Sequence, residues 1–144
     1  MIDLKRNEEL HQAIELMYFS YRAFTKEPDK LLAKRGLNRV HHRVLYFVGR
    51  NPGIAVNELL TILDVSKQAL NQPMRQLLEM RLIDSTRAHY DGRVRLLSLT
   101  DKGQKLEKRL SDTQTKLFAK VFSATSKKSE KAWLEVMRAL SVED

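Results

Sequence analysis

Cysteine is absent from this sequence of 144 residues. The absence excludes disulfide bonds, thiolate metal sites, a cysteine nucleophile and redox sensing through thiols. Long apolar runs are absent as well, so no segment is predicted to span a membrane. The charged start MIDLKRNEELHQ lacks the apolar stretch of a secretion signal, and we therefore expect a cytoplasmic protein.

Acidic residues are in deficit, since 18 Asp and Glu accompany 26 Lys and Arg and give a formal net charge of +8. A surplus of this size is typical of proteins that bind nucleic acid, although many basic proteins do not. The sequence also lacks a phosphate-binding glycine loop, a nucleophile elbow and an acid pair that stands out from the surface charge. We expect a single domain, 1–144, that binds a partner and is not an enzyme.

Helical periodicity dominates both ends of the chain. Apolar residues recur at helical spacing over 4–26, and Pro28 with its acidic neighbours is predicted to end that helix. A short helical piece that ends at Gly36 is expected to follow. Thr100 is predicted to cap a long helix, and 127–141 to form the last one.

The centre of the chain has the pattern of helices joined by a tight turn. Asn38 is predicted to cap a helix that runs to about residue 48, and a short helix is expected over 56–63. Asp64 suits the turn because Asp tolerates the left-handed conformation, and Ser66 suits the N-cap of the next helix. The sequence therefore predicts a helix-turn-helix.

Pro73 lies inside the second helix of this pair, where a proline removes the bond to the Ala69 carbonyl and costs roughly 3 kcal/mol. Either the helix starts later, with Gln72 or Pro73 in its first turn, or it starts at Ser66 and is kinked or loosened near residues 69–72. We favour the start at Ser66, because Ser66 caps well and Leu70 belongs to the apolar stripe.

The polar face of that helix consists mostly of neutral amides. Its members lie at i, i+3, i+4 and i+7: Gln68, Asn71, Gln72 and Arg75. Asn and Gln can pair with adenine, and Arg with guanine, in the major groove of DNA. The face is a candidate for base readout, with an ordinary polar helix surface as the alternative.

An Asp-Gly pair separates two predicted strands, 82–89 and 93–99. It favours a tight type I′ turn, whose two central residues both take positive φ. The tip of this hairpin is cationic, because Arg87, Arg93 and Arg95 accompany only one acid there, Asp91.

The stretch from Leu37 to about Leu110 resembles the MarR family of bacterial winged-helix transcription regulators. The likeness rests on LNRVHHRVLYFV, NELLTILDVSKQALNQPMRQLLEMRLI, the D-x-R of Asp91 and Arg93, and LSLTDKG at 97–103. It implies a mainly α fold with a small β-hairpin wing (α+β). In that fold 37–100 form the winged helix-turn-helix, and 4–26 with 101–141 form the helical dimerisation region.

The resemblance further implies a homodimer that binds a palindrome in double-stranded DNA, usually as a repressor. By position, the recognition helix supplies Ser66, Lys67, Gln68, Asn71, Gln72 and Arg75. The wing supplies Arg87, Asp91, Arg93 and Arg95, with Arg93 in the minor groove and Asp91 holding it. The alternative is a winged helix that binds protein or RNA, although the hairpin offers only Tyr90 for base stacking.

The sequence departs from the family pattern after the recognition helix. Arg81 stands where the family often has glycine, so the end of that helix must be capped differently.

Two further groups of residues have two interpretations each. The start of the helix after Gly36 either contacts phosphates, through Asn38, Arg39 and His42, or is an ordinary solvated face. The aromatic residues either line a pocket for a small aromatic effector or belong to the core and dimer interface: Tyr18, Tyr21, Phe24, Phe47 and Trp133.

The adjacent His41 and His42 point about 100° apart on a helix, so they cannot chelate one ion together, and no metal or other cofactor is predicted.

Overall fold

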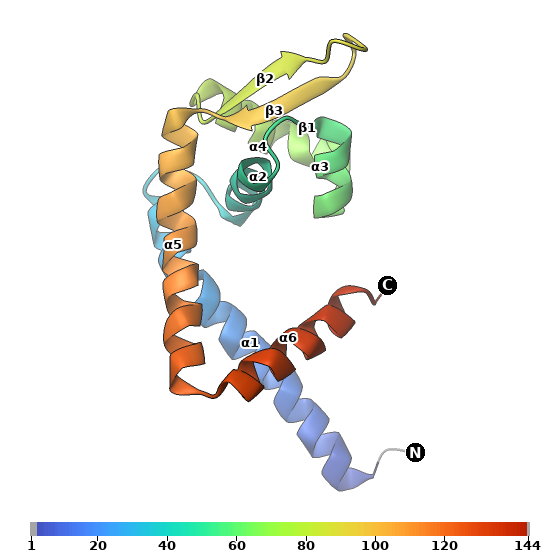
Figure 1. Cartoon of the computed structure of the whole chain (residues 1–144), viewed down its shortest axis with the longest axis vertical. Coiled ribbons are helices and arrows are strands. Elements are labelled where there is room, and N and C mark those ends of the chain that lie inside the picture. Colours follow the sequence, from blue (N-terminus) through green and yellow to red (C-terminus); the bar gives the residue numbers. More distant parts are fainter. Residues whose placement is uncertain (1–2, 144) are drawn as a thin grey trace.

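The computed structural model describes residues 3–143, which form helices at both ends of the chain around a small sheet (Figure 1). In chain order the elements are α1 (Leu4–Ala33), α2 (Arg39–Arg50), β1 (Ile54–Ala55), α3 (Val56–Leu63), α4 (Lys67–Glu79), β2 (Ile83–Arg87), β3 (Arg95–Leu99), α5 (Asp101–Ala124) and α6 (Lys127–Ser141). The predicted fold class, mainly α with a β-hairpin, is confirmed. Within 3–143 no helix is both long and apolar enough to cross a bilayer.

The hydrophobic core lies mainly in one half of the molecule, which we call the winged unit: α2, α3, α4, the sheet and the first half of α5. Leu32, at the end of α1, also belongs to this core. Each element of the winged unit contributes a buried leucine, and these leucines belong to one cluster: Leu45, Leu59, Leu77, Leu97 and Leu110. The winged unit therefore buries its apolar faces within a single chain.

The sheet has three antiparallel strands in the order β1-β3-β2. In its hairpin Ile83 pairs with Leu99 and Arg87 with Arg95, so both strands are shorter than predicted. The additional strand β1 is only two residues long, and it exists because Ile54 pairs with Leu97 on β3. Sequence periodicity cannot reveal so short a strand.

The predicted helix end at Pro28 is wrong, because α1 continues through Pro28 to Ala33. A proline at this position leaves the carbonyl of Phe24 without its usual intrahelical donor. The side chain of Gln114, on α5, donates to that carbonyl at 3.3 Å and replaces the missing bond. The chain turns only afterwards, where Gly36 takes a φ of +70°.

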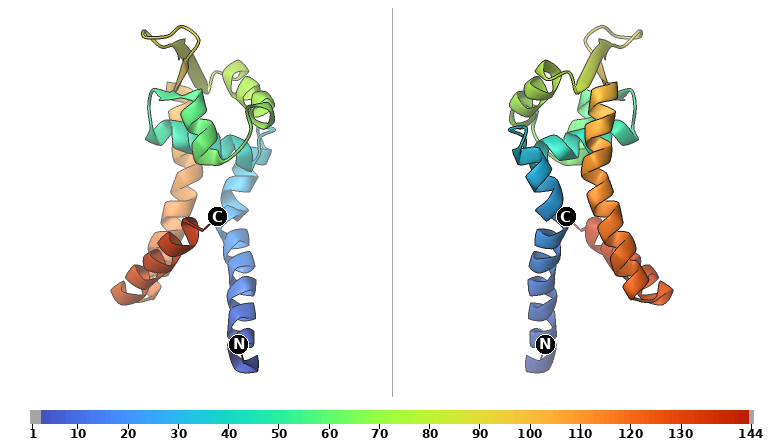
Figure 2. Two further views of the ribbon diagram at one scale, coloured as in Figure 1. Left: turned by 90° about the vertical axis from the view of Figure 1, so that its right-hand side faces the viewer. Right: turned by 90° about the vertical axis from the view of Figure 1, so that its left-hand side faces the viewer.

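The terminal helices extend away from the winged unit. Two views at right angles show the first half of α1 and the pair α5–α6 diverging from it (Figure 2). All residues from 3 to 23 are exposed except Leu10, which is partly buried, and α6 contains no buried residue. An aromatic cluster of Phe118, Phe122 and Trp133 holds α6 to α5, with ring centroids 5.3 to 5.6 Å apart.

Candidate nucleic-acid interface

The helix-turn-helix forms as the sequence predicts. Asp64 ends α3 in the left-handed conformation, with a φ of 52°. The hydroxyl of Ser66 accepts from the Ala69 N–H at 3.1 Å, so Ser66 is the N-cap of α4. The helix then runs through Pro73 to Glu79, which confirms the favoured start at Ser66.

The six predicted residues of α4 all lie exposed. Leu70 and Leu77 are buried in the core on the opposite side of the helix. The exposed group comprises Ser66, Lys67, Gln68, Asn71, Gln72 and Arg75. One face of the helix therefore presents amides and cations together to solvent, and their contact with DNA stays a prediction.

The end of α4 is capped by the start of α5. Arg81 takes a φ of 57°, the left-handed conformation that usually favours glycine. The hydroxyl of Thr100 donates to the Arg81 carbonyl, at 2.6 Å, and the ammonium of Lys102 donates to the Met80 carbonyl, at 3.1 Å. These two bonds explain how Arg81 can occupy this position, and the role of Lys102 was not predicted from the sequence.

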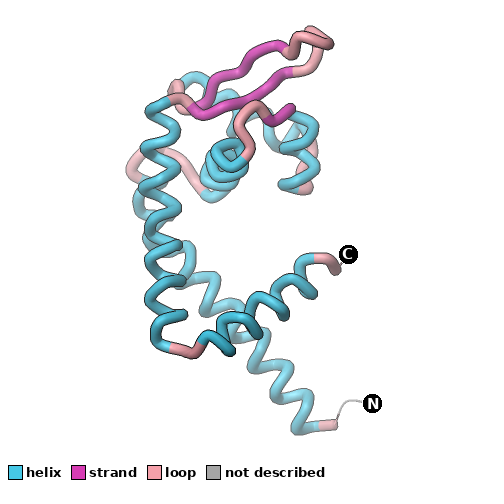
Figure 3. Tube along the Cα trace, viewed as in Figure 1, coloured by secondary structure: helices cyan, strands magenta, loops and turns pink. Residues whose placement is uncertain are grey.

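The tip of the hairpin is a loop and not the predicted type I′ turn (Figure 3). Neither Asp91 nor Gly92 takes a positive φ. The loop closes where the Ala88 N–H donates to the Val94 carbonyl, at 2.9 Å, and the Val94 N–H donates to the Asp91 carbonyl, at 3.0 Å. The prediction is wrong because the turn does not need a positive φ at Asp91. Instead, the side chain of Asp91 accepts a hydrogen bond within the turn.

The carboxylate of Asp91 binds Arg93 in three ways. It accepts from the Arg93 backbone N–H at 3.0 Å, and from Nε and Nη2 of the guanidinium, each at 3.2 Å. The hydrogen bonds from Arg93 hold the pKa of Asp91 below its ordinary value. The side chain of Arg93 is nevertheless 92% exposed, so the pair orders a cation that protrudes into solvent.

The other two arginines of the hairpin lie opposite each other in the strand register. Arg95 donates to the hydroxyl of Ser85, at 2.9 Å, and to its carbonyl, at 3.0 Å. These bonds fix Arg95 along the strand, and Arg87 is exposed next to it. The loop and its strands thus carry cations from tip to base.

The start of α2 does not fit the predicted phosphate contacts. His42 is buried beside Ser111, so the prediction is wrong for this residue. Asn38 accepts from the Val40 N–H as the N-cap of α2. Arg39 forms a bidentate pair with Asp29 of α1, at 2.9 to 3.3 Å. Both exposed side chains therefore already have partners within the chain.

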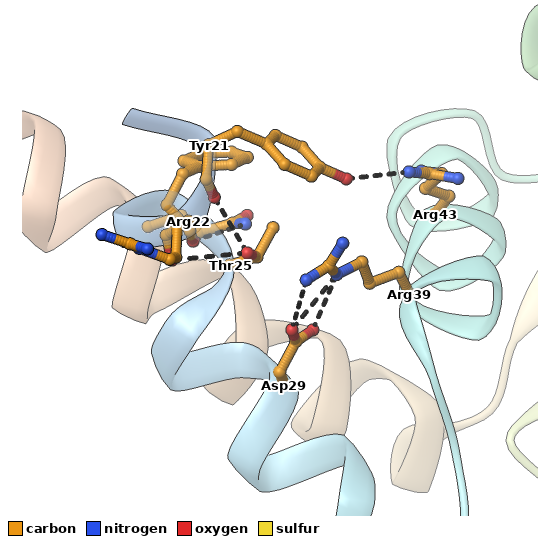
Figure 4. Close-up of polar contacts among 8 residues, drawn as sticks. Tyr21, Arg22, Thr25, Asp29, Arg39 and Arg43 are labelled. Atoms are coloured by element: carbon orange, nitrogen blue, oxygen red, sulfur yellow. Dashed lines mark hydrogen bonds and ion pairs between the residues drawn. The ribbon is translucent and has the colours of Figure 1, made fainter. Parts of the chain in front are cut away.

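Behind α2 lies a cavity of about 420 Å³, between α1, α2 and α5. Its aromatic walls include Tyr21, Phe24, Phe47 and Phe118. Arg43 donates to the hydroxyl of Tyr21 at 3.0 Å (Figure 4). The Arg39 guanidinium lies over the ring of Tyr21, 5.1 Å from its centroid. Arg43 and the ion pair of Arg39 with Asp29 therefore border an apolar space.

The aromatic residues considered in the sequence divide between two roles. Tyr21, Phe24 and Phe47 line this cavity, whereas Tyr18 lies on the exposed face of α1 and Trp133 packs in the aromatic cluster with α5. The sequence could not separate the two groups, because the cavity depends on how three distant helices meet.

Comparison with known proteins gives consistent matches. A sequence model of the MarR family matches residues 35–94. The HTH-type transcriptional regulator PetP of Rhodobacter capsulatus is 37% identical over 134 residues, which cover 93% of this chain and 81% of PetP.

Two solved structures have the same fold. Streptococcus pneumoniae FabT in complex with DNA has a TM-score of 0.76 at 18% identity, covering 96% of this chain and 95% of FabT. The PcaV transcriptional regulator of Streptomyces coelicolor, in complex with its natural ligand, has a TM-score of 0.69 at 18% identity, covering 98% and 96% of the two chains.

Proposed function

The chain belongs to the MarR family of transcriptional regulators, and we propose that it is a homodimeric repressor that binds a palindromic operator in duplex DNA. The observation that carries the proposal is the exposed, amide-rich face of α4 in the same rigid unit as an ordered, protruding Arg93. The DNA in the FabT structure supports it. The role is one of binding in the cytoplasm, without catalysis.

Within each subunit α4 enters the major groove and the hairpin reaches the adjacent minor groove. Gln68, Asn71, Gln72 and Arg75 have side chains that can read base edges there. A narrow minor groove has a strongly negative potential, which favours an arginine held ready at the tip of a wing. Asp91 reduces the freedom that Arg93 has to lose on binding.

The exposed apolar residues of the terminal helices support a dimer. Ile14 and Met17 on α1, and Val136 and Leu140 on α6, are 47 to 63% exposed. Large apolar side chains left exposed on two helices are typical of an interface. Two copies related by a twofold axis would place their recognition helices on half-sites about 34 Å apart.

We also propose the cavity between α1, α2 and α5 as the site of a small aromatic effector with a negative charge. Its aromatic walls suit a flat ring, and Arg43 suits an anionic group at its edge, whereas Arg39 is already paired with Asp29. The ligand in the PcaV structure supports an effector for a protein of this fold.

Selection of bound sequences from random duplex DNA tests the operator. We expect a palindrome with half-sites about one helical turn apart, and binding that weakens steeply with salt. A single-stranded RNA of the same sequence should not compete. Equal binding to RNA, or selection without any consensus, would favour the alternative of a winged helix that binds RNA or protein.

The wing and the recognition helix should differ in how their loss affects binding. Arg93→Ala should weaken binding to nearly all sequences and reduce the slope of log K against log salt by about one. Arg75→Ala should instead relax the preference at one base pair, by about 1–3 kcal/mol. Titrations of both variants against operator and random DNA measure this; an unchanged salt slope in Arg93→Ala contradicts the wing assignment.

A further inference from the structure

His41 is a buried histidine whose two ring nitrogens both lie within hydrogen-bond distance of other groups of the chain. Its side chain is 2% exposed. The backbone N–H of Asn38 donates to Nδ1 at 3.0 Å, which completes the capping box of α2. On the other side of the ring, Nε2 lies 2.8 Å from Oε1 of Gln76, on α4.

The direction of the second bond follows from the first. Nδ1 also lies 3.1 Å from Oδ1 of Asn38, but that oxygen already accepts from the Val40 N–H. In the capping box Nδ1 accepts from the Asn38 backbone N–H, which can only donate, so Nδ1 carries no proton. The neutral imidazole then carries its proton on Nε2 and donates it to the Gln76 oxygen. The hydrogen bond that caps α2 thus determines that Nε2 of His41 donates to α4.

Gln76 lies at a sensitive point of the recognition helix. It follows Arg75 directly and lies one turn after Gln72, both of which face solvent. The packing between α2 and α4 is otherwise apolar, with Val44, Leu70 and Leu77 in the shared core. Apolar contacts are non-directional and permit a helix to rotate or slide slightly, whereas a short hydrogen bond fixes both movements.

Pro73 increases the importance of this contact, because it removes the N–H that would bind the Ala69 carbonyl in the middle of α4. The first half of the helix is fixed by the Ser66 cap. The second half carries Arg75, and the bond between His41 and Gln76 joins it to α2.

We propose that His41 is a positioning residue for base readout: through Gln76 it sets the orientation of the half of α4 that carries Arg75, and so determines the sequence preference of that half. The proposal rests on the proposed function, since it assumes that α4 reads an operator. His41 itself does not touch DNA.

The test uses the full-length protein and the operator selected by the wild type, with single-base-pair variants of that operator. Arg75→Ala and Gln68→Ala first map the base pairs that each half of α4 reads. Gln76→Met then removes the bond to His41 and keeps the length of the side chain. Gln76→Asn, whose amide is one methylene too short to reach His41, is the second variant if Gln76→Met does not fold.

We expect either Gln76 variant to lose about tenfold in operator affinity, the scale of one base contact, with affinity for random duplex DNA changed less than about twofold. The base preference should be lost at the base pairs that Arg75→Ala maps. It should be kept at the base pairs that Gln68→Ala maps. His41→Gln, made with Gln76 unchanged, should keep the wild-type profile, because its amide can accept from Asn38 and donate to Gln76.

An equal loss in both halves, or an unchanged profile, would overturn the positioning role. If the wild type itself selects no operator, the proposed function fails and the positioning role fails with it. The two failures are distinguishable, because the selection with the wild type is done before any Gln76 variant is made.

Discussion

The two halves of the molecule differ in how completely one chain buries their apolar side chains. In the winged unit Leu59 and Leu77 have no exposed surface, and the cluster around them is continuous. On α6 no residue is buried, and Val136 is 63% exposed. The winged unit therefore buries its apolar side chains within one chain, whereas the terminal helices leave theirs exposed, as the proposed dimer requires.

The proposed effector cavity lies where these halves meet. Phe24 and Phe118 come from the terminal helices, and Arg39 and Arg43 come from the first turns of α2. A ligand there would touch both the helices of the proposed dimer interface and the helix that holds α4. An effector bound at this location could therefore change the distance between the two recognition helices of the proposed dimer.

The largest effect is expected where α5 packs on the sheet. A Cβ on Gly103 would collide with the carbonyl of Leu82, a backbone atom that cannot move without moving β2. Gly103→Val should therefore lower the free energy of unfolding by roughly 3 kcal/mol or more. Thermal denaturation measures this.

Gly92→Val is the matched control, since a Cβ on Gly92 meets nothing within 4 Å and its φ is not positive. Its midpoint should stay near that of the wild type. A Gly103→Val protein as stable as this control would mean that the winged unit tolerates a gap between α5 and β2.

The next largest effect is expected at the terminal helices. The double variant Val136→Glu, Leu140→Glu places two charges on the exposed apolar face of α6 and should dissociate the proposed dimer. The winged unit should stay folded, and operator affinity should fall on the order of 100-fold, because each half-site is then bound separately. Fluorescence anisotropy with the operator measures this.

Lys131→Glu is a suitable control, because it changes charge on α6 without touching the apolar face. If the double variant is a monomer and binds the operator as tightly as the wild type, the terminal helices do not contribute to operator binding through a dimer.

A smaller effect is expected from the two prolines within helices, one in each half. Pro73→Ala should raise the free energy of unfolding by about 1–3 kcal/mol, because it restores the N–H that the Ala69 carbonyl lacks. Pro28→Ala should give no such gain, since Gln114 already binds the free carbonyl and the Pro28 ring is fully buried. Urea denaturation distinguishes the two; equal gains would contradict the role of Gln114.

The smallest effect concerns His42, at the boundary between the halves. Burial lowers the pKa of His42 below 6.5, with Arg43 adding to the effect and Asp29 opposing it. Below about pH 6.5 the unfolded chain therefore binds more protons, and stability falls as the pH falls, by at most about 1.4 kcal/mol per pH unit for one proton. His42→Phe should flatten this slope in urea titrations between pH 7 and 5; an unchanged slope would rule out His42 as its cause.

Local signals predicted much of this fold from the sequence. Asn38, Ser66 and Thr100 all cap the helices expected of them. Asp64 takes its left-handed conformation because a tight turn requires it locally. Helix ends and tight turns are governed by neighbours in the chain, so their residues could be recognised without a structure.

The errors occurred where a distant residue decides the outcome. Gln114 lets α1 continue through Pro28, and Leu97 makes a strand of Ile54. The contact between His41 and Gln76 joins residues 35 apart in sequence, and no periodicity indicates it. The exposed face of α4 could be predicted, whereas the contacts that position this face could not.

Sedimentation equilibrium of the unmodified protein at micromolar concentration tests the difference between the halves most directly. The mass of one chain is 16.8 kDa. If a second copy covers the apolar faces of α1 and α6, the protein should sediment with twice that mass and should not dissociate on dilution to nanomolar concentration in the presence of operator. A species of 16.8 kDa throughout the micromolar range would contradict the claim that a second copy covers these faces.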